Sequence, residues 1–216
     1  DPIEYQLDGV SQVQISKKIG MTFASGLRSV LRQDPDVIMI GEIRDQETAV
    51  MAIQAALTGH LVFSTLHTND AASAVTRLVD LGIEPYLVGS SLMGVLAQRL
   101  VRRNCEFCST PQMPNASELE LLGYDLDEQT LRNARAGAGC DKCRGTGYRG
   151  RAGCFELLTI NDDIRKMVHA RATASEISDA AVRGGMQSLH EDAMSKVRNG
   201  RTTLNEVLRV SAKGGF

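Results

Sequence analysis

The sequence predicts an α/β protein in which a mostly parallel sheet precedes a cysteine-bearing subdomain and a small helical domain. Three observations predict this organisation. Short apolar runs alternate with helical patterns through the first hundred residues, four cysteines form two Cys-x-x-Cys pairs, and short helical patterns follow Leu158. Strands that alternate with helices are joined by crossover connections, which leave the strands parallel.

The first predicted helix and strand lie on either side of a proline. Thr22 is expected to cap a helix over residues 23–33, whose apolar positions follow helical spacing. Pro35 ends that helix, because the residue before a proline is pushed out of the helical region. The all-apolar run 37–40 then lies between Pro35 and Gly41. Such a run is typical of a strand buried on both faces of a parallel sheet.

A second helix and strand repeat this order. Asp45 is expected to cap a helix over residues 46–57, and Gly59 follows in the position favoured beyond a helix end. The apolar run 61–66 predicts a second strand, and a helix over residues 71–81 comes next.

Four cysteines predict a zinc site. Cys105 and Cys108 form one Cys-x-x-Cys pair, Cys140 and Cys143 form the other, and 31 residues separate the pairs. Two such pairs supply the four ligands of a tetrahedral zinc ion, and four thiolates leave no open position for catalysis. The alternatives are free thiols or a redox-active pair. The fifth cysteine, Cys154, is expected to pack as a small apolar group.

The last part of the chain predicts a small helical domain without evident chemistry. Its expected helices span 162–170, 175–183, 188–199 and 203–210, with caps at Asn161, Thr173 and Thr202.

Length and charge exclude several classes of protein. The 216 residues suffice for one ordinary domain or two small ones. The net charge is −2 and 23% of the residues are charged, so no global basic character points to nucleic acid or a membrane surface. No apolar run reaches the roughly 18 residues of a membrane-spanning helix. Without a signal peptide or an initial methionine, we expect a cytosolic piece of a longer protein.

Polar side chains follow both predicted strands. Glu42 and Arg44 come after the first strand, and His67 comes after the second. Ligands of open parallel sheets bind at the carboxyl ends of the strands. An apolar strand that ends in an acid is how nucleotide-hydrolysing proteins place a carboxylate beside hydrated magnesium and the γ-phosphate. The alternative is that Glu42 and Asp45 form a solvated loop and a helix cap.

Three stretches resemble the secretion ATPase superfamily, which drives type II secretion and type IV pilus machines. Residues 32–45 resemble its Walker B region, residues 58–70 its His box, and residues 1–5 its Asp box without the preceding glutamate. The cysteine quartet matches the metal-binding insert of the secretion and pilus-assembly branches. Retraction motors of the superfamily typically lack that insert.

The resemblance implies the C-terminal half of a RecA-like ATPase core. Residues 1–103 would form that half, residues 104–150 the zinc subdomain, and residues 151–216 the C-terminal helical domain. The sequence contains no Gly-x-x-x-x-Gly-Lys-Ser/Thr motif, so the phosphate-binding Walker A loop is missing. We therefore expect the isolated chain not to hydrolyse ATP at a meaningful rate.

By resemblance, the acids and a glycine bind ATP and Mg²⁺. Glu42 would be the Walker B acid, holding magnesium through water, with Gly41 beside it. Asp1 and Glu4 are what remains of the Asp box. For Glu4, the alternative is an ordinary solvated carboxylate on an exposed strand.

The resemblance also assigns histidines and arginines to the catalytic region. It places His60 and His67 near the γ-phosphate and the subunit interface. Arg44, Arg32 and Arg28 would make subunit contacts or complete a neighbouring site. The alternatives are that His60 is a structural residue at a helix end and that the arginines only confer solubility.

The function implied is that of a hexameric ATPase coupling ATP hydrolysis to type II secretion, through pseudopilus assembly and protein export. The alternatives are a type IV pilus assembly ATPase and a non-catalytic, zinc-stapled docking module. Expected partners are its own copies and inner-membrane platform proteins, at the cytoplasmic face of the inner membrane, and no nucleic acid. The basic stretch from Lys142 to Arg151 would contact anionic lipid or another partner, or be a solvated face.

Overall fold

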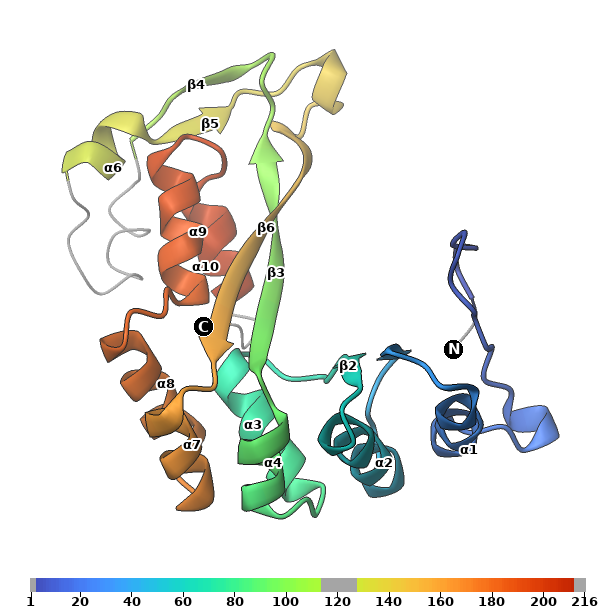
Figure 1. Cartoon of the computed structure of the whole chain (residues 1–216). Coiled ribbons are helices and arrows are strands. Elements are labelled where there is room, and N and C mark those ends of the chain that lie inside the picture. Colours follow the sequence, from blue (N-terminus) through green and yellow to red (C-terminus); the bar gives the residue numbers. More distant parts are fainter. Residues whose placement is uncertain (1–2, 114–127, 212–216) are drawn as a thin grey trace. The chain divides into compact units, whose positions relative to one another are not determined.

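A computed structural model describes residues 3–113 and 128–211 (Figure 1). Asp1, expected in the Asp box remnant, lies outside the described residues. The chain divides into two compact units built from interleaved segments. Unit 1 comprises Asp1–Thr68, Ser73–Met93 and Ile160–Ile177, and unit 2 comprises Asn69–Ala72, Gly94–Thr159 and Ser178–Phe216.

Unit 1 begins with short helical elements. The 3-10 helix η1 spans Lys17–Ile19, helix α1 spans Phe23–Val30, and a 3-10 turn η2 continues it over Leu31–Gln33. Thr22 caps α1 as predicted, because its side chain accepts a hydrogen bond from the Ser25 amide.

The two predicted strands of unit 1 form a parallel pair. Strand β1 (Val37–Ile40) lies beside β2 (Leu61–Ser64), with Ile40 opposite Ser64. Helix α2 (Gln46–Leu57) connects them, and its cap is Asp45, as predicted.

The prediction that the first strand is buried on both faces is wrong. Ile38 and Ile40 are buried, but Val37 and Met39 are 58% and 73% exposed. An all-apolar run does not reveal how many faces of a strand are covered. Within the described residues, the two-stranded sheet is covered on one face only.

The remaining helices of unit 1 pack closely. Helix α4 (Pro85–Ser91) contacts α7 (Asp162–His169), where the Arg165 side chain donates to the Gly89 carbonyl at 2.8 Å. Helices α3 (Ala71–Asp80) and α8 (Ala174–Arg183) each have one end in unit 1 and the other in unit 2.

Unit 2 is built on a long antiparallel ribbon. Strand β3 (Gly94–Asn104) pairs with β6 (Tyr148–Thr159), and the two run side by side in Figure 1. Helices α9 (Leu189–Arg198) and α10 (Leu204–Ser211) pack on one face of the ribbon. The buried residues of this core are Val101, Cys154, Leu189, Ala193, Met194, Val197, Leu204, Val207 and Val210.

The cysteine region carries a second antiparallel pair. Strand β4 (Ser109–Pro111) pairs with β5 (Arg135–Gly137), helix α6 (Glu128–Asn133) precedes β5, and a 3-10 turn η3 spans Asp141–Cys143.

These elements confirm an α/β class but not a mostly parallel sheet. Among the strand pairs of the described residues, one is parallel and two are antiparallel. The predicted domain boundaries at residues 103 and 150 fall inside β3 and β6, and the three-part division stays a prediction. None of the helices in residues 3–113 and 128–211 has the length and apolar character to cross a bilayer.

The cap of the last helix differs from the prediction. Thr203, not Thr202, accepts the hydrogen bond from the Glu206 amide, at 3.1 Å. The Thr202 hydroxyl instead donates to the Arg102 carbonyl on β3. The sequence offers two adjacent threonines, and only the contact with β3 distinguishes their roles.

Candidate functional site

The loops after β1 and β2 are joined by hydrogen bonds. The Thr65 hydroxyl donates to the Gly41 carbonyl at 2.7 Å, and the Ile43 amide donates to the Thr65 carbonyl at 3.0 Å. The pairing of the two strands therefore continues past their ends. This brings the side chains that follow each strand to the same place.

Glu42 lies at the centre of the side chains that follow the two strands. Although Glu42 is only 5% exposed, its Oε2 atom accepts hydrogen bonds from Arg44 Nε at 2.5 Å and from His67 Nε2 at 2.9 Å. The side chains of Arg44 and His67 are 61% and 81% exposed. The structure thus joins three of the predicted site residues, with Arg44 and His67 both contacting the buried carboxylate of Glu42.

The charge state of this cluster follows from its hydrogen bonds. The Arg44 hydrogen bond lowers the pKa of Glu42 below its usual value; burial opposes this shift and His67 adds to it. Glu42 is therefore an ionised acceptor at neutral pH. Because a carboxylate only accepts, His67 Nε2 carries a hydrogen, and Nδ1 of a neutral His67 ring is left as an acceptor.

His60 lies at the end of α2 and makes different contacts. Its Nδ1 lies 2.9 Å from the Ala55 carbonyl and 3.1 Å from the Thr58 hydroxyl. A carbonyl only accepts, so Nδ1 donates and Nε2 of a neutral ring is free to accept. This geometry fits the structural alternative for His60, and no hydrogen bond among the described residues joins it to Glu42.

The structure does not bring the other predicted site residues of unit 1 into the cluster of Glu42, Arg44 and His67. Arg28 on α1 pairs with Glu47 on α2 at 3.3 Å, and both side chains are more than half exposed. Arg32 in η2 and Glu4 near the N-terminus are exposed. Their assigned roles stay predictions.

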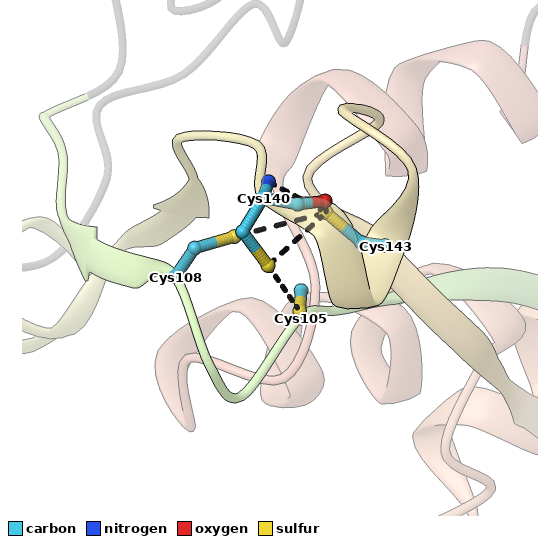
Figure 2. Close-up of side chains that lie close together, drawn as sticks. All are labelled: Cys105, Cys108, Cys140 and Cys143. Carbon is cyan, nitrogen blue, oxygen red and sulfur yellow. Dashed lines mark hydrogen bonds between the residues drawn. The ribbon is translucent and has the colours of Figure 1, made fainter.

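The four predicted cysteines converge, as Figure 2 shows. Their sulfur atoms all lie within 4.8 Å of one another. The Sγ atoms of Cys105 and Cys140 are 3.9 Å apart, and those of Cys108 and Cys143 are also 3.9 Å apart. A tetrahedral zinc ion with bonds of about 2.3 Å would place its sulfur ligands about 3.8 Å apart. The quartet therefore has the spacing of a metal site.

Backbone amides surround one of these sulfurs. Burial alone would raise the pKa of Cys143, but hydrogen bonds from the Cys140 and Gly147 amides outweigh it and lower the pKa to about 6. Burial raises the pKa of Cys108 to about 12, so this thiol would give up its proton only on binding metal. N–H groups aimed at sulfur favour the thiolate, which is the form that binds metal. The donor set fits a closed, four-thiolate metal site.

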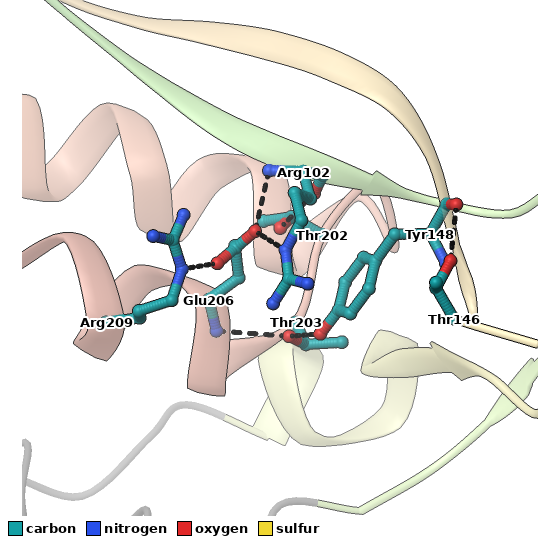
Figure 3. A network of polar contacts seen from close by, with 7 residues as sticks. All are labelled: Arg102, Thr146, Tyr148, Thr202, Thr203, Glu206 and Arg209. Carbon is teal, nitrogen blue, oxygen red and sulfur yellow. Dashed lines mark hydrogen bonds and ion pairs between the residues drawn. The ribbon is translucent and has the colours of Figure 1, made fainter.

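A buried ion-pair network adjoins the cysteines, drawn in Figure 3. The side chain of Glu206 on α10 is fully buried and accepts hydrogen bonds from the Arg102 amide at 2.9 Å, the Arg102 guanidinium at 2.5 Å and the Arg209 guanidinium. Arg102 also lies over the Tyr148 ring, 4.2 Å from its centroid. Burial would raise the pKa of Glu206, yet these donors hold it below its usual value. The network fixes α10 to β3, which leads into Cys105, and to β6, which follows Cys143.

The sequence prediction missed this network and two further residues, Arg99 and Glu156. Arg99 contacts Asn69, and the Glu156 carboxylate is buried within β6. The signal for Glu156 is a lone acid inside the otherwise apolar stretch 154–158. A charge in such a stretch indicates a buried carboxylate that needs specific partners. Arg99 gives no comparable signal, because arginines recur along the same strand.

Comparison with known proteins gives a consistent result. Residues 1–209 match the family described as "Type II/IV secretion system protein". Type II secretion system protein E of Pseudomonas aeruginosa is 53% identical over 212 residues, which are 98% of this chain and 41% of that protein. Type IV pilus assembly ATPase PilB of Thermus thermophilus is 52% identical over 210 residues, 96% of this chain and 23% of that protein.

A solved structure agrees in fold. The pilus retraction motor PilT with bound ADP superposes with a TM-score of 0.60 at 27% identity, over 87% of this chain and 43% of PilT. The chain thus spans less than half the length of each of these proteins.

Proposed function

Because this chain belongs to the Type II/IV secretion system protein family, we propose that it is part of an ATPase that couples ATP hydrolysis to type II secretion. One observation carries the proposal. The buried Glu42 carboxylate accepts hydrogen bonds from His67 and Arg44 where two parallel strands end. That edge of a parallel sheet is where nucleotides bind. The fold class we propose is the C-terminal half of a RecA-like core, within a mostly parallel sheet that the longer protein completes.

Each residue of the cluster has a separate proposed role in phosphoryl transfer. Glu42, ionised at neutral pH, would hold hydrated Mg²⁺ as the Walker B acid, beside Gly41, and orient the attacking water. Glu4 and Asp1 would add to the binding of ATP and Mg²⁺. Bound Mg²⁺ supplies charge neutralisation to the phosphates.

Arg44 provides a positive charge beside this carboxylate, and His67 provides an N–H donor. Both side chains are largely exposed, so Arg44 can donate to a phosphate oxygen while it donates to Glu42, and His67 Nε2 can donate to either acceptor. His67, in the proposed His box, would report the presence of the γ-phosphate through this exchange of partners.

Other predicted residues are assigned to the boundary between subunits of a hexamer. Arg28 and Arg32 lie on the exposed end of α1 and its continuation, where cations can serve a neighbouring nucleotide site. His60 has its Nδ1 fixed by Ala55, which leaves Nε2 as an acceptor for a neighbouring group.

The cysteine quartet is proposed to hold structural Zn²⁺. Cys105, Cys108, Cys140 and Cys143 supply four sulfurs at the right spacing and leave no open position. The ion would keep the chain between β3 and β6 folded and take no part in hydrolysis. In the proposed architecture, residues 104–150 form this subdomain, residues 1–103 the core half and residues 151–216 the helical domain.

The proposed location is the cytoplasmic face of the inner membrane, against platform proteins. Lys142, Arg144 and Arg151 are exposed near the cysteines and could meet anionic lipid, whereas Arg149 is paired with Glu106 at 3.7 Å. No nucleic acid partner is proposed, since the net charge of the chain is −2.

A second candidate function is type IV pilus assembly. It is favoured by the 52% identity to a pilus assembly ATPase, which nearly equals the 53% identity to the secretion protein.

Taken alone, the chain would act as a zinc-stapled docking module without hydrolysis. In support, Val37, Met39 and Phe63 expose an apolar surface on β1 and β2 that the longer protein would cover.

Deleting the gene in its host tests the choice between secretion and pilus assembly. We expect proteins that are normally exported to stay inside the cell while surface pili remain, and the intact gene, but not its Glu42→Gln form, to restore export. Loss of pili with normal export would favour the second candidate. Normal export and normal pili would contradict both.

A further inference from the structure

Thr65 contacts the chain on both sides of Glu42. Its hydroxyl donates to the Gly41 carbonyl at 2.7 Å, and its own carbonyl accepts from the Ile43 amide at 3.0 Å. Gly41 and Ile43 are the residues immediately before and after Glu42. One residue of the loop after β2 therefore fixes the backbone on either side of the buried carboxylate.

The same residue lies two positions before His67. Two residues of extended chain reach at most about 7 Å, so fixing Thr65 limits where the His67 ring can lie. His67 Nε2 in turn donates to Glu42 Oε2 at 2.9 Å. Two hydrogen bonds of Thr65 and one of His67 thus join the loops after β1 and β2, and all three lie inside unit 1.

The Thr65 hydroxyl bond begins where the backbone pairing of the two strands ends. The last paired residues of β1 and β2 are Ile40 and Ser64. At the next position the Thr65 side chain supplies a donor to the opposite loop, at the distance that is usual for an O–H···O hydrogen bond. A hydroxyl can make this bond, whereas an aliphatic side chain of the same size cannot. The contact therefore depends on the residue type at position 65.

Exposure separates this contact from core packing. Glu42 is only 5% exposed, whereas Thr65, His67 and Gly41 are exposed. Removing the Thr65 hydroxyl would leave no buried polar group without a partner, because water can reach the exposed Gly41 carbonyl. The removal should therefore cost little stability while it frees the two loops to move apart.

We propose that Thr65 is a positioning residue for ATP hydrolysis, whose hydroxyl holds the loops after β1 and β2 at the separation that lets His67 donate to Glu42. This inference rests on the function proposed above and extends it to a residue that acts through Glu42 and His67. The alternative is that the hydroxyl only closes the end of the strand pair, in which case its loss would alter stability without changing kcat.

The first test measures ATP hydrolysis by the full-length protein with Thr65→Val and Thr65→Ser. Valine keeps the β-branched shape of threonine but cannot donate, whereas serine keeps the hydroxyl. We expect Thr65→Val to lower kcat by about 10-fold with little change in KM, as misplacing a catalytic group does, and Thr65→Ser to stay within about 2-fold of the wild type. Thr76→Val is the matched control, because it removes a hydroxyl that donates to the Ser73 carbonyl within the part of α3 that belongs to unit 1.

Hydrogen exchange gives a readout that does not depend on hydrolysis. In the 216-residue chain, the Ile43 amide donates to the Thr65 carbonyl, and the Ala49 amide donates to the Asp45 carbonyl at the start of α2. We expect Thr65→Val to speed exchange of the Ile43 amide by about 10-fold and to leave that of the Ala49 amide unchanged, because only the contact between the loops opens. An unchanged rate at Ile43, or an equal acceleration at both amides, would overturn the inference.

The deciding measurement combines Thr65→Val with His67→Ala. If Thr65 acts by placing His67 against Glu42, losing the hydroxyl costs little once the imidazole is gone. The double variant should then have nearly the kcat of His67→Ala alone. Losses that multiply would overturn the inference, as would Thr65→Ser at the kcat of Thr65→Val, or Thr65→Val at that of the wild type.

Failure of this inference is distinguishable from failure of the proposed function. If the full-length wild-type protein does not hydrolyse ATP, or Glu42→Gln hydrolyses it normally, the proposed function and this inference both fall. If Glu42→Gln is inactive while Thr65→Val hydrolyses ATP at the wild-type rate, the function stands and only the positioning role is overturned.

Discussion

Glu42 and His67 are 25 positions apart in the sequence, yet His67 Nε2 donates to Glu42 Oε2 over 2.9 Å. The contact exists because β1 and β2 pair in parallel and end together, with Ile40 opposite Ser64. Each side chain alone would be an ordinary polar residue in a loop. With Arg44, they form a cluster in which the Glu42 carboxylate stays ionised beside two donors.

The charge on Glu42 should depend on Arg44. Because the folded-state pKa of Glu42 is lowered, its stabilising contribution is present at neutral pH and is lost as the pH falls through that lowered pKa. Arg44→Ala removes the main cause, so the titration should move upward, toward the usual value of about 4.3. Carboxyl carbon NMR of the chain measures this midpoint. Arg77→Ala, at an exposed position on α3, is the control, and an unshifted midpoint in Arg44→Ala would refute the assignment.

The cysteine quartet should retain metal. After exhaustive dialysis, elemental analysis is expected to find about one zinc ion per chain, since four thiolates form a closed site. Cys143→Ser should lose the metal, because it removes the sulfur that the Cys140 and Gly147 amides contact. Cys154→Ser is the matched control, as Cys154 lies in the core of unit 2, outside the quartet. A metal-free wild-type chain would contradict the zinc proposal.

The close approach of two glycines should be essential to the metal site. A Cβ atom on Gly137 would lie 2.0 Å from the Gly147 carbonyl oxygen, so Gly137→Ala must displace backbone. Such overpacking costs about 1–3 kcal/mol, and it would shift the Gly147 amide that donates to Cys143. Zinc competition with a chelator should show weaker binding. Gly184→Ala, whose Cβ would meet nothing closer than 3.3 Å, should bind zinc normally.

Glu206 should stabilise unit 2 substantially. Replacing one partner of a fully buried ion pair costs about 3–5 kcal/mol, and because Arg102 and Arg209 are partly exposed we expect about 2 kcal/mol for Glu206→Gln. Urea unfolding measures the loss. Glu176→Gln, at an exposed helix cap, should cost at most about 1 kcal/mol. Equal stability of the Glu206 variant and the wild type would show that the network contributes nothing.

The sequence predicted those elements whose limits are set by single residues. Pro35 and Gly41 delimit β1, Asp45 caps α2, and the fixed Cys-x-x-Cys spacing brings the sulfurs together. These signals are local, so they are visible without knowing what packs where.

The ribbon was harder to predict because its pattern is irregular. Strand β3 mixes arginines with apolar residues. The start of β6 is rich in glycine, a composition that is typical of a loop. The contacts of Arg99 and Glu156 depend on that pairing and on helices that begin far away in the sequence. Long-range partners of this kind leave no local pattern.

Steady-state ATP hydrolysis by the full-length protein, with and without Glu42→Gln, tests the central claim most directly. We predict that Glu42→Gln lowers kcat by about 100-fold or more, as loss of one group that stabilises the transition state electrostatically does, while Asp36→Asn at an exposed position before β1 retains activity. The isolated 216-residue chain should show no meaningful hydrolysis. Hydrolysis at the wild-type rate by Glu42→Gln would contradict the account.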